Sequence, residues 1–322
     1  VTLKNIPLVK DIFTMVELLN FIGLRAKILK KKNIIKINNN SNKINTLAPY
    51  KLVKTMRAGV LVLGSLLTKY GKAKVSLPGG CAIGTRPVDL HLFALKKLGA
   101  KIRIKKLGLI INLKGRNIII KHRKIKTLQI IHSVIFDRIE LGTYLIASAL
   151  QVKNNITIDK IDPKIIKSEI NILKKIGVKI KQKKTSIIIK KNKKLKNINI
   201  STKPYPGFPT DLQAQLMVLL TQANGVSKIR EDIFENRFMH VPELKRMGAD
   251  IEIKNKTAII KGPTKLTGAE VMATDLRASV SLVLAGLVAE NRTIINRIYH
   301  LDRGYEFLES KLKSCKAEIK RV

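Results

Sequence analysis

A cysteine among glycines, followed five residues later by an arginine, is the part of this sequence best suited to chemistry. Cys81 lies in the stretch Leu77–Leu90 (LPGGCAIGTRPVDL), whose Pro-Gly-Gly start disfavours regular structure. Thr85 predicts a helix N-cap directly after it. A helix N-terminus and the charge of Arg86 would both stabilise a thiolate and attract phosphate. Although a lone loop cysteine is inert in most proteins, this stretch indicates a reactive cysteine beside an anionic substrate.

Other strings extend this pattern along the whole chain. They are APYKLVKTMRAG (Ala48–Gly59), FPTDLQAQ (Phe208–Gln215), FENRFMHVPEL (Phe234–Leu244), VMATDLRASVSLVLAG (Val271–Gly286) and RIYHLDRGYE (Arg297–Glu306). Together with the cysteine stretch, they resemble the UDP-N-acetylglucosamine enolpyruvyl transferases, in the order and nearly the spacing of that family. The resemblance implies transfer of enolpyruvate from phosphoenolpyruvate to the 3-hydroxyl of UDP-N-acetylglucosamine with release of phosphate, the first step of peptidoglycan synthesis. The sister enzymes that use shikimate 3-phosphate lack the cysteine loop, so Cys81 argues against them.

The resemblance also implies a role for individual residues. Cys81 would be the general acid, and Asp211 the base beside the sugar hydroxyl, although Asp211 alone could equally be a carboxylate at a helix N-terminus. Arg86 and Arg303 would hold the phosphate of phosphoenolpyruvate, and Arg277 would lie near its carboxylate, since guanidinium groups pair bidentately with both. The remaining predicted substrate contacts are Arg57 for the UDP-sugar, the uridine-lining stretch Arg86, Pro87, Val88, Asp89 and Leu90, and the aliphatic Ile233. Asp302 is interpreted as a structural partner and His240 as a packing residue.

A helix end followed by a strand start recurs five times at a spacing of about 70 residues. The copies are LLNFIGLRAKI (Leu18–Ile28), LKKLGAKI (Leu95–Ile102), LKKIGVKI (Leu173–Ile180), LKRMGADI (Leu244–Ile251) and LKSCKAEI (Leu312–Ile319). Gly23, Gly99, Gly177 and Gly248 predict helix C-caps in the first four copies. The last copy has Cys315 and Lys316 where Gly-Ala is expected, so Cys315 is interpreted as structural.

A second helix, rich in small and apolar residues, is predicted between these ends over Leu52–Leu67, Ile139–Leu150, Asp211–Leu220 and Asp275–Val288. The resemblance gives these repeats an architecture of the α/β class. It implies two domains, each an inverse α/β barrel of three units, over residues 1–136 and 137–322, with the active site in the cleft between them. Five unit ends accompany only four of the second helices. The resemblance therefore implies that the N-terminal substrate segment and one internal unit of the first domain, near Lys121–Thr127, are missing.

These losses leave an alternative, a degenerate and catalytically impaired copy of the enzyme. A barrel without one unit exposes strand edges, so we expect low stability for the first domain. The sequence leaves the oligomeric state open. It also predicts no cofactor, because its five histidines are scattered and no phosphate-binding glycine motif is complete.

Composition supports a globular protein of two domains. The net charge of +41 on 322 residues would ordinarily indicate nucleic acid or an anionic membrane as a partner. However, Lys, Ile and Asn crowd the same segments and share A/T-rich codons, so genomic base composition explains the excess. The densest run, Lys179–Lys196, predicts a solvated edge or turn around a strand at Ser186–Ile189. A nucleic-acid-binding protein remains the alternative from another class.

Two further observations concern the compartment. The two cysteines, Cys81 and Cys315, form no paired framework, which predicts a reducing cytoplasm. No apolar run reaches the roughly 18 residues that a membrane span needs, and no signal peptide begins at Val1. We therefore expect a cytoplasmic protein with small-molecule substrates and neither nucleic acid nor membrane as a partner.

Overall fold

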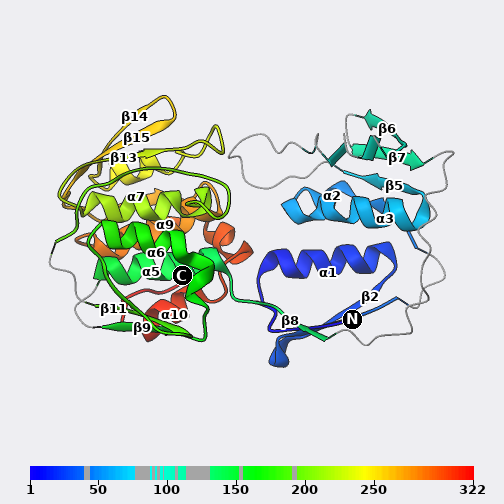
Figure 1. The fold of residues 1–322 in the computed structure, drawn as a ribbon, viewed down its shortest axis with the longest axis horizontal. Helices are drawn as coiled ribbons and strands as arrows, with labels where there is room; N and C mark the ends of the chain where they lie inside the picture. The colour runs from blue at the N-terminus through cyan, green and yellow to red at the C-terminus, as the bar shows by residue number, and fades with distance from the viewer. Residues whose placement is uncertain are drawn as a thin grey trace. The chain divides into compact units, whose positions relative to one another are not determined.

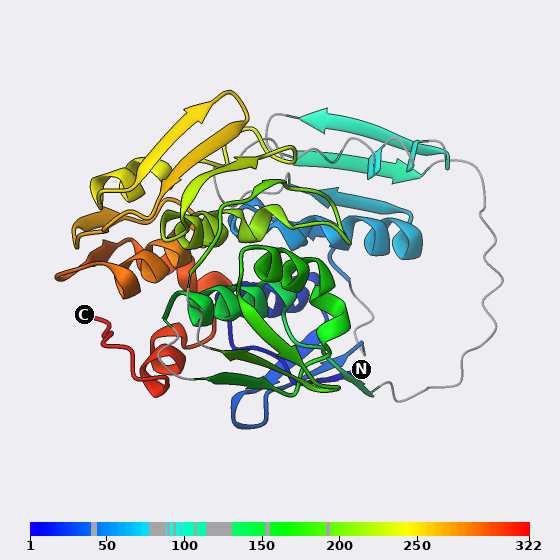
Figure 2. The same cartoon turned by 60° about the vertical axis from the view of Figure 1, so that its left-hand side comes forward.

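The contacts in the computed structural model divide the chain into two compact units. The model describes residues 1–39, 44–76, 88, 91–92, 95–96, 98–105, 108–113, 131–151, 155–190 and 194–322. The described residues up to Ile135 belong to the first unit and Phe136–Val322 to the second (Figures 1 and 2). Five of the predicted site residues lie outside the described residues, as does the side chain of Arg57; they are Cys81, Arg86, Pro87, Asp89 and Leu90.

Three four-stranded sheets share one topology. Two strands run parallel, and the second of them pairs on its other side with an antiparallel hairpin. In the first unit the strands are β8 (Ile131–Ser133), β1 (Thr2–Lys4), β3 (Ile34–Asn38) and β2 (Arg25–Leu29), and then β4 (Leu47–Ala48), β5 (Lys72–Val75), β7 (Gly108–Leu113) and β6 (Ala100–Lys105). In the second unit they are β12 (Asn199–Ser201), β13 (Gly225–Arg230), β15 (Thr257–Gly262) and β14 (Asp250–Lys254). The predicted repeat is therefore a real structural unit.

Two smaller sheets complete the second unit. In one, β11 (Ser186–Lys190) lies between β9 (Ile156–Asp159) and β10 (Lys179–Gln182), and both pairings are antiparallel. In the other, β16 (Glu270–Met272) runs parallel to β17 (Ile294–Asn296). The basic run up to Lys190 is thus a hairpin with exposed lysines on its edge strand, as the sequence predicts. Among the described residues, the first unit has two sheets and the second has three.

One class of helix ends at a left-handed residue. Its members include α1 (Lys10–Ile22), α6 (Lys167–Lys175) and α8 (Val241–Arg246), which each precede a hairpin, and α10 (Leu308–Ser314), which no strand follows among the described residues. The four predicted glycines have φ between +92° and +110°, which confirms them as helix ends, because only glycine adopts this conformation without strain. In the last copy the prediction is wrong by one position. Lys316, with φ +68°, takes the place of the glycine, and Cys315 is an exposed C-cap residue with φ −87°.

The second class of helix lies inside the units. In the second unit it comprises α5 (Arg138–Gln151), η4 and α7 (Thr210–Leu212 and Gln213–Thr221), and α9 (Leu276–Val288), close to the predicted ranges. In the first unit the predicted single helix is broken into α2 (Tyr50–Val53), η2 (Arg57–Leu61) and α3 (Val62–Tyr70). The break falls at Met56, whose φ of −142° and ψ of 143° are extended and so end the helix.

The three inner helices form the core of the second unit. Every residue of α7 is buried, and so is Ala278–Ala285 of α9, which explains why apolar residues are not confined to one face of either helix. α5 and η4 approach closely at Gly142, where a Cβ would meet the side chain of Leu212. Figure 1 shows these helices between the β13–β15 and β9–β11 sheets, so the helices are inside and the sheets outside. Among the described residues, no helix is long and apolar enough to cross a bilayer.

Shorter 3-10 turns connect the remaining elements. They are η1 (Lys30–Lys32), η3 (Pro163–Ile166) and η5 (Ile298–Arg303). The described residues of the first unit form a smaller apolar cluster around α1 and α3 than the one around the inner helices of the second unit.

Candidate active site

Each inner helix of the second unit begins beside an aspartate, and one of the three differs from the others. Asp137 accepts hydrogen bonds from the backbone N–H groups of Ile139 (2.6 Å) and Glu140 (3.1 Å). Asp275 likewise accepts from Arg277 (2.7 Å) and Ala278 (3.1 Å). Both are ordinary helix caps. Asp211, at the start of η4 and α7, instead pairs with two arginine side chains.

The carboxylate of Asp211 is held unequally by these two arginines. Nη2 of Arg237 donates to Oδ1 at 2.6 Å, whereas Nη2 of Arg277 lies 3.5 Å from Oδ2, at the limit of a hydrogen bond. Arg237 is nearly buried, with 3% of its side chain exposed, and Arg277 has 12% exposed, but Asp211 has 39% exposed. Burial raises the pKa of Asp211, and Arg277 and Arg237 outweigh this effect, so the net pKa is lowered. The structure therefore presents an ionised carboxylate that solvent can reach.

A buried cluster of polar side chains forms hydrogen bonds with Arg277 and with one another. Nη1 of Arg277 donates to the hydroxyl of Tyr305 at 3.1 Å, and that hydroxyl lies 2.9 Å from Oγ1 of Thr143 on α5. Nε2 of Gln215 donates to the backbone oxygen of Asp211 (2.9 Å) and to Oγ1 of Thr143 (3.2 Å). The cluster connects all three inner helices at the end where Asp211 lies.

Glu231 is a positioning residue that the sequence analysis missed. It directly follows β13 and is 1% exposed. Its Oε1 accepts from the N–H groups of Ile233 (2.9 Å) and Phe234 (3.1 Å), and its Oε2 accepts from Oγ1 of Thr210 (2.8 Å). Glu231 thereby fixes both the residue before Asp211 and the loop that leads to Arg237. No local signal distinguishes it from a surface glutamate.

Arg237 lies in the motif Phe234–Leu244 but is not among the predicted site residues. The structure places it directly beside Asp211. His240, three residues later, is buried, and its Nε2 has no hydrogen-bond partner among the described residues. Burial lowers the pKa of His240 to about 4, with Arg237 acting in the same direction and Asp275 opposing it. A neutral, enclosed imidazole agrees with its interpretation as a packing residue.

The other described candidates lie as follows. Ile233 is exposed on the loop that Glu231 fixes, and Arg303 is half-buried at the end of η5, two residues before Tyr305. Asp302 pairs with Arg321 at 2.8 Å, which agrees with a structural role. Val88 is buried in the first unit. The structure thus brings Asp211, Arg237 and Arg277 together, and Tyr305 accepts a hydrogen bond from Arg277.

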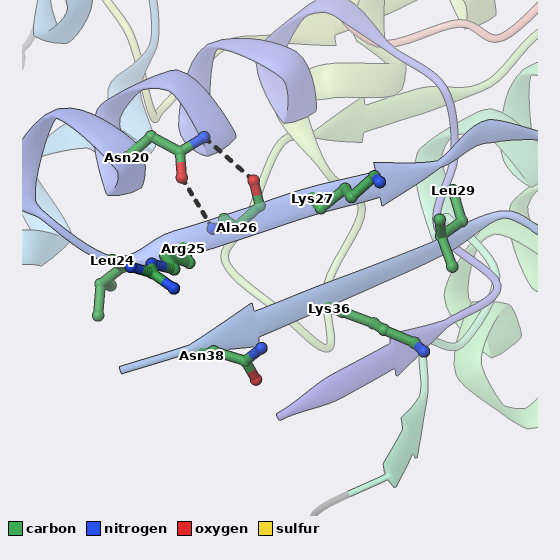
Figure 3. A pocket seen from close by; sticks show the side chains of 8 residues that line it. All are labelled: Asn20, Leu24, Arg25, Ala26, Lys27, Leu29, Lys36 and Asn38. Atoms are coloured by element: carbon green, nitrogen blue, oxygen red, sulfur yellow. Dashed lines mark hydrogen bonds between the residues drawn. The ribbon is translucent and has the colours of Figure 1, made fainter. Parts of the chain in front are cut away.

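A cavity of about 500 Å³ lies on the sheet of the first unit (Figure 3). Lys27 and Lys36 are register partners across β2 and β3, and both are exposed, as is Arg25. Asn20 of α1 closes one end, where its side chain makes two hydrogen bonds with the backbone of Ala26. We interpret this as a solvated basic sheet face. In the described part of the chain, no three His, Cys, Asp or Glu side chains are close enough to hold a metal ion.

Helices inside and sheets outside, in repeated units, form the enolpyruvyl transferase fold. The crystal structure of the enolpyruvyl transferase NikO from Streptomyces tendae has this fold, with a TM-score of 0.77 at 21% identity over 99% of this chain and 89% of that chain. The family model of EPSP synthase (3-phosphoshikimate 1-carboxyvinyltransferase) matches residues 1–130 and 104–312.

Curated relatives define the branch of this class. The UDP-N-acetylglucosamine 1-carboxyvinyltransferase of Pelagibacter ubique (strain HTCC1062) is 51% identical over 100% of this chain and 91% of its own length. The proteins of the same name from Rickettsia felis and Geobacter metallireducens are 42% and 43% identical over 99% of this chain, and over 91% and 90% of their own lengths. The chain belongs to the UDP-N-acetylglucosamine 1-carboxyvinyltransferase family, and it is a transferase.

The same comparison supports the predicted internal loss. The alignment with the Pelagibacter ubique protein extends over 382 positions, although this chain has 322 residues. The relative therefore carries stretches that this chain lacks and that together approach one repeat unit of about 70 residues. The first unit, with two sheets among its described residues, agrees with this interpretation. The predicted position of the loss, near Lys121–Thr127, lies outside the described residues.

Proposed function

We propose that this chain transfers the enolpyruvyl group of phosphoenolpyruvate to the 3-hydroxyl of UDP-N-acetylglucosamine and releases phosphate. The names of its relatives support this substrate pair. The observation that carries the proposal is the carboxylate of Asp211, which caps no helix and is instead held by Arg237 and Arg277 at one end of the inner helices. A solvent-accessible carboxylate beside guanidinium groups is suited to accept a proton from one substrate while the arginines bind the other.

The reaction needs one base and one acid. Asp211 takes the proton of the sugar hydroxyl as the sugar oxygen bonds to C2 of phosphoenolpyruvate. Cys81 gives a proton to the methylene carbon C3, so that the double bond becomes a tetrahedral adduct. Loss of a proton from C3 and cleavage of the C2–O bond to phosphate then restore the double bond in the product. The sulfur of Cys81 is also a nucleophile that can add to C2 or to an epoxide inhibitor.

The arginines bind the anionic groups. Arg86 and Arg303 would hold the phosphate, and Arg277 the carboxylate of phosphoenolpyruvate, because guanidinium groups make paired hydrogen bonds with both anions. Arg57 would contact the UDP-sugar. The uridine would be enclosed by Arg86, Pro87, Val88, Asp89, Leu90 and Ile233.

Substrate binding would make Asp211 a better base. In the free protein Arg277 and Arg237 together hold the pKa of Asp211 down, against the effect of burial. A substrate carboxylate on Arg277 adds negative charge near Asp211 and competes for the same guanidinium. Both effects raise the pKa of Asp211 toward the range in which a carboxylate accepts a proton efficiently. Proton transfer would therefore be coupled to the presence of phosphoenolpyruvate.

One observation favours a second interpretation, a catalytically impaired copy. The chain lacks stretches of the Pelagibacter ubique relative that approach a repeat unit, and the first unit has the smaller described apolar cluster. If substrate contacts are lost with that stretch, the second unit would keep its arginine–aspartate site without turnover.

Phosphate release from phosphoenolpyruvate in the presence of UDP-N-acetylglucosamine tests both interpretations. The wild type is compared with Cys81→Ala, Asp211→Asn and the control Asp250→Asn, whose aspartate forms a surface ion pair with Lys261 at 3.5 Å. We expect sugar-dependent release that falls by about 10²–10⁴-fold in Asp211→Asn and is unchanged in the control. No release from folded wild type would establish the impaired copy. Equal losses in Asp211→Asn and Asp250→Asn would remove the proposed role of Asp211.

A further inference from the structure

The hydroxyl of Tyr305 contacts side chains from all three inner helices, and the reaction does not use it directly. The side chain of Tyr305 is 3% exposed. The hydroxyl oxygen lies 3.1 Å from Nη1 of Arg277, 2.9 Å from Oγ1 of Thr143 and 3.4 Å from Nε2 of Gln215. Such a buried hydrogen-bond network restricts the orientations of its members.

The direction of these hydrogen bonds follows from the proton count. The hydroxyl of Thr143 donates its single proton to the backbone oxygen of Ile139 at 3.0 Å. We therefore assign Tyr305 as the donor to Oγ1 of Thr143, and its oxygen accepts from Nη1 of Arg277. The two N–H groups of Gln215 go to the backbone oxygen of Asp211 and to Thr143. Burial raises the pKa of Tyr305 in spite of the opposing charge of Arg277, so the phenol keeps the proton that this arrangement requires.

The guanidinium of Arg277 is divided between two acceptors as a result. Nη1 points to Tyr305, and Nη2 reaches Oδ2 of Asp211 only at 3.5 Å. A guanidinium free to turn would place two N–H groups on the carboxylate, which is the preferred bidentate geometry. Oδ1 of Asp211 is already bound by Arg237 at 2.6 Å, so Oδ2 is the oxygen left with weak contact.

We propose that Tyr305 is a positioning residue that keeps Arg277 out of a bidentate ion pair with Asp211 and so leaves Oδ2 of Asp211 available to the substrate. This role rests on the proposed function of Asp211 as the base. It also keeps Arg277 available to a substrate carboxylate, because an arginine closed on its own aspartate would have to break two hydrogen bonds first.

The charged and titratable groups around Asp211 are few in the described structure. Arg237 precedes α8, Arg277 lies on α9, and Tyr305 follows η5; Asp137, before α5, acts on Arg277. Of these, only Tyr305 competes with Asp211 for the N–H groups of Arg277 at a distance of 3.1 Å. Removal of the Tyr305 hydroxyl should therefore change mainly the hydrogen bond between Arg277 and Asp211.

Tyr305→Phe tests the proposal, because it removes one oxygen and keeps the ring. The matched control is Tyr144→Phe, a half-buried tyrosine that packs against the same apolar cluster and whose hydroxyl makes no hydrogen bond to Arg277. We expect kcat of Tyr305→Phe to fall about tenfold, and the acid limb of its pH profile to move about one unit lower, because a closed ion pair makes Asp211 a weaker base. KM for the UDP-sugar should change much less. A purely structural role would lower the thermal midpoint without moving the limb.

A crystal structure of Tyr305→Phe gives a readout that needs no turnover. We expect Nη1 of Arg277 within about 3 Å of Oδ2 of Asp211. If wild type itself is inactive, the proposed function fails, and this distance still decides the role of Tyr305. An unmoved Arg277, or kinetics equal to Tyr144→Phe, would overturn it. Should Tyr305→Phe not fold, Thr143→Val removes the acceptor of the Tyr305 hydroxyl and should produce a smaller shift in the same direction.

Discussion

Oγ1 of Thr210 donates a hydrogen bond of 2.8 Å to the buried carboxylate of Glu231, and this contact links the residue before Asp211 to the loop that leads to Arg237. The other oxygen of Glu231 binds the backbone of that loop, so this one side chain sets the distance between Asp211 and Arg237. Glu231 therefore positions the ion pair of Asp211 and Arg237 without being part of it.

Replacement of Glu231 tests whether this side chain positions Asp211 and Arg237. Glu231→Ala should destabilise the protein by about 3 kcal/mol or more, since it leaves buried donors unpaired, whereas Glu231→Gln should cost about 1 kcal/mol. Urea unfolding measures both. We also expect a lower kcat in Glu231→Gln at saturating substrate, although Glu231 itself is buried. A Glu231→Ala protein as stable as the surface variant Glu290→Ala would contradict this assignment.

Arg237→Gln should move the pH dependence in the direction opposite to Tyr305→Phe. It removes the 2.6 Å ion pair, so the pKa of Asp211 should rise, and the acid limb of the rate profile should move up by about one unit. The measurement is kcat across the acidic range. Arg246→Gln is the control, because Arg246 is exposed and forms an ion pair with Glu243 of its own helix at 3.6 Å. An unmoved limb would show that Arg237 does not act on the base.

Two ion pairs of similar length should differ in their effect on stability. Glu169 is 2% exposed and lies 2.6 Å from Nε of Arg138. Nη2 of the same arginine donates to the backbone oxygen of Gly207. Glu169→Ala should cost about 3–5 kcal/mol, because a largely buried guanidinium loses its partner. Glu290→Ala breaks an exposed pair with Lys265 at 2.9 Å and should cost less than about 1 kcal/mol. Equal losses in thermal unfolding would contradict the argument from burial.

His240 should make the stability of the protein depend on pH. Burial lowers its pKa to about 4 from the ordinary value of 6.5, so the unfolded chain binds the proton first as the pH falls. Its contribution is complete above about pH 6.5 and is lost by about pH 4, a change of about 3 kcal/mol. His240→Gln should remove this slope from urea unfolding curves, whereas His91→Gln, at an exposed position, should keep it. An identical slope in all three proteins would show that another group carries it.

Local signals made much of the fold predictable. The glycines at four helix ends, and the small apolar residues of the inner helices, act within a few residues of sequence, so they are visible without the structure. The fifth repeat shows the limit of such signals. Lys316 adopts the left-handed conformation there without being glycine, and no strand follows it among the described residues.

The motifs by themselves determined the family and the residues Asp211 and Arg277, but not how these residues are used. Thr210-Asp211-Leu212 and Thr274-Asp275-Leu276 have the same sequence, yet one aspartate caps a helix and the other meets arginines 26 and 66 residues away. Only the packing of α5, α7 and α9 brings those side chains together with Tyr305. Partners that come from separate elements are set by tertiary structure, since no short-range preference encodes them.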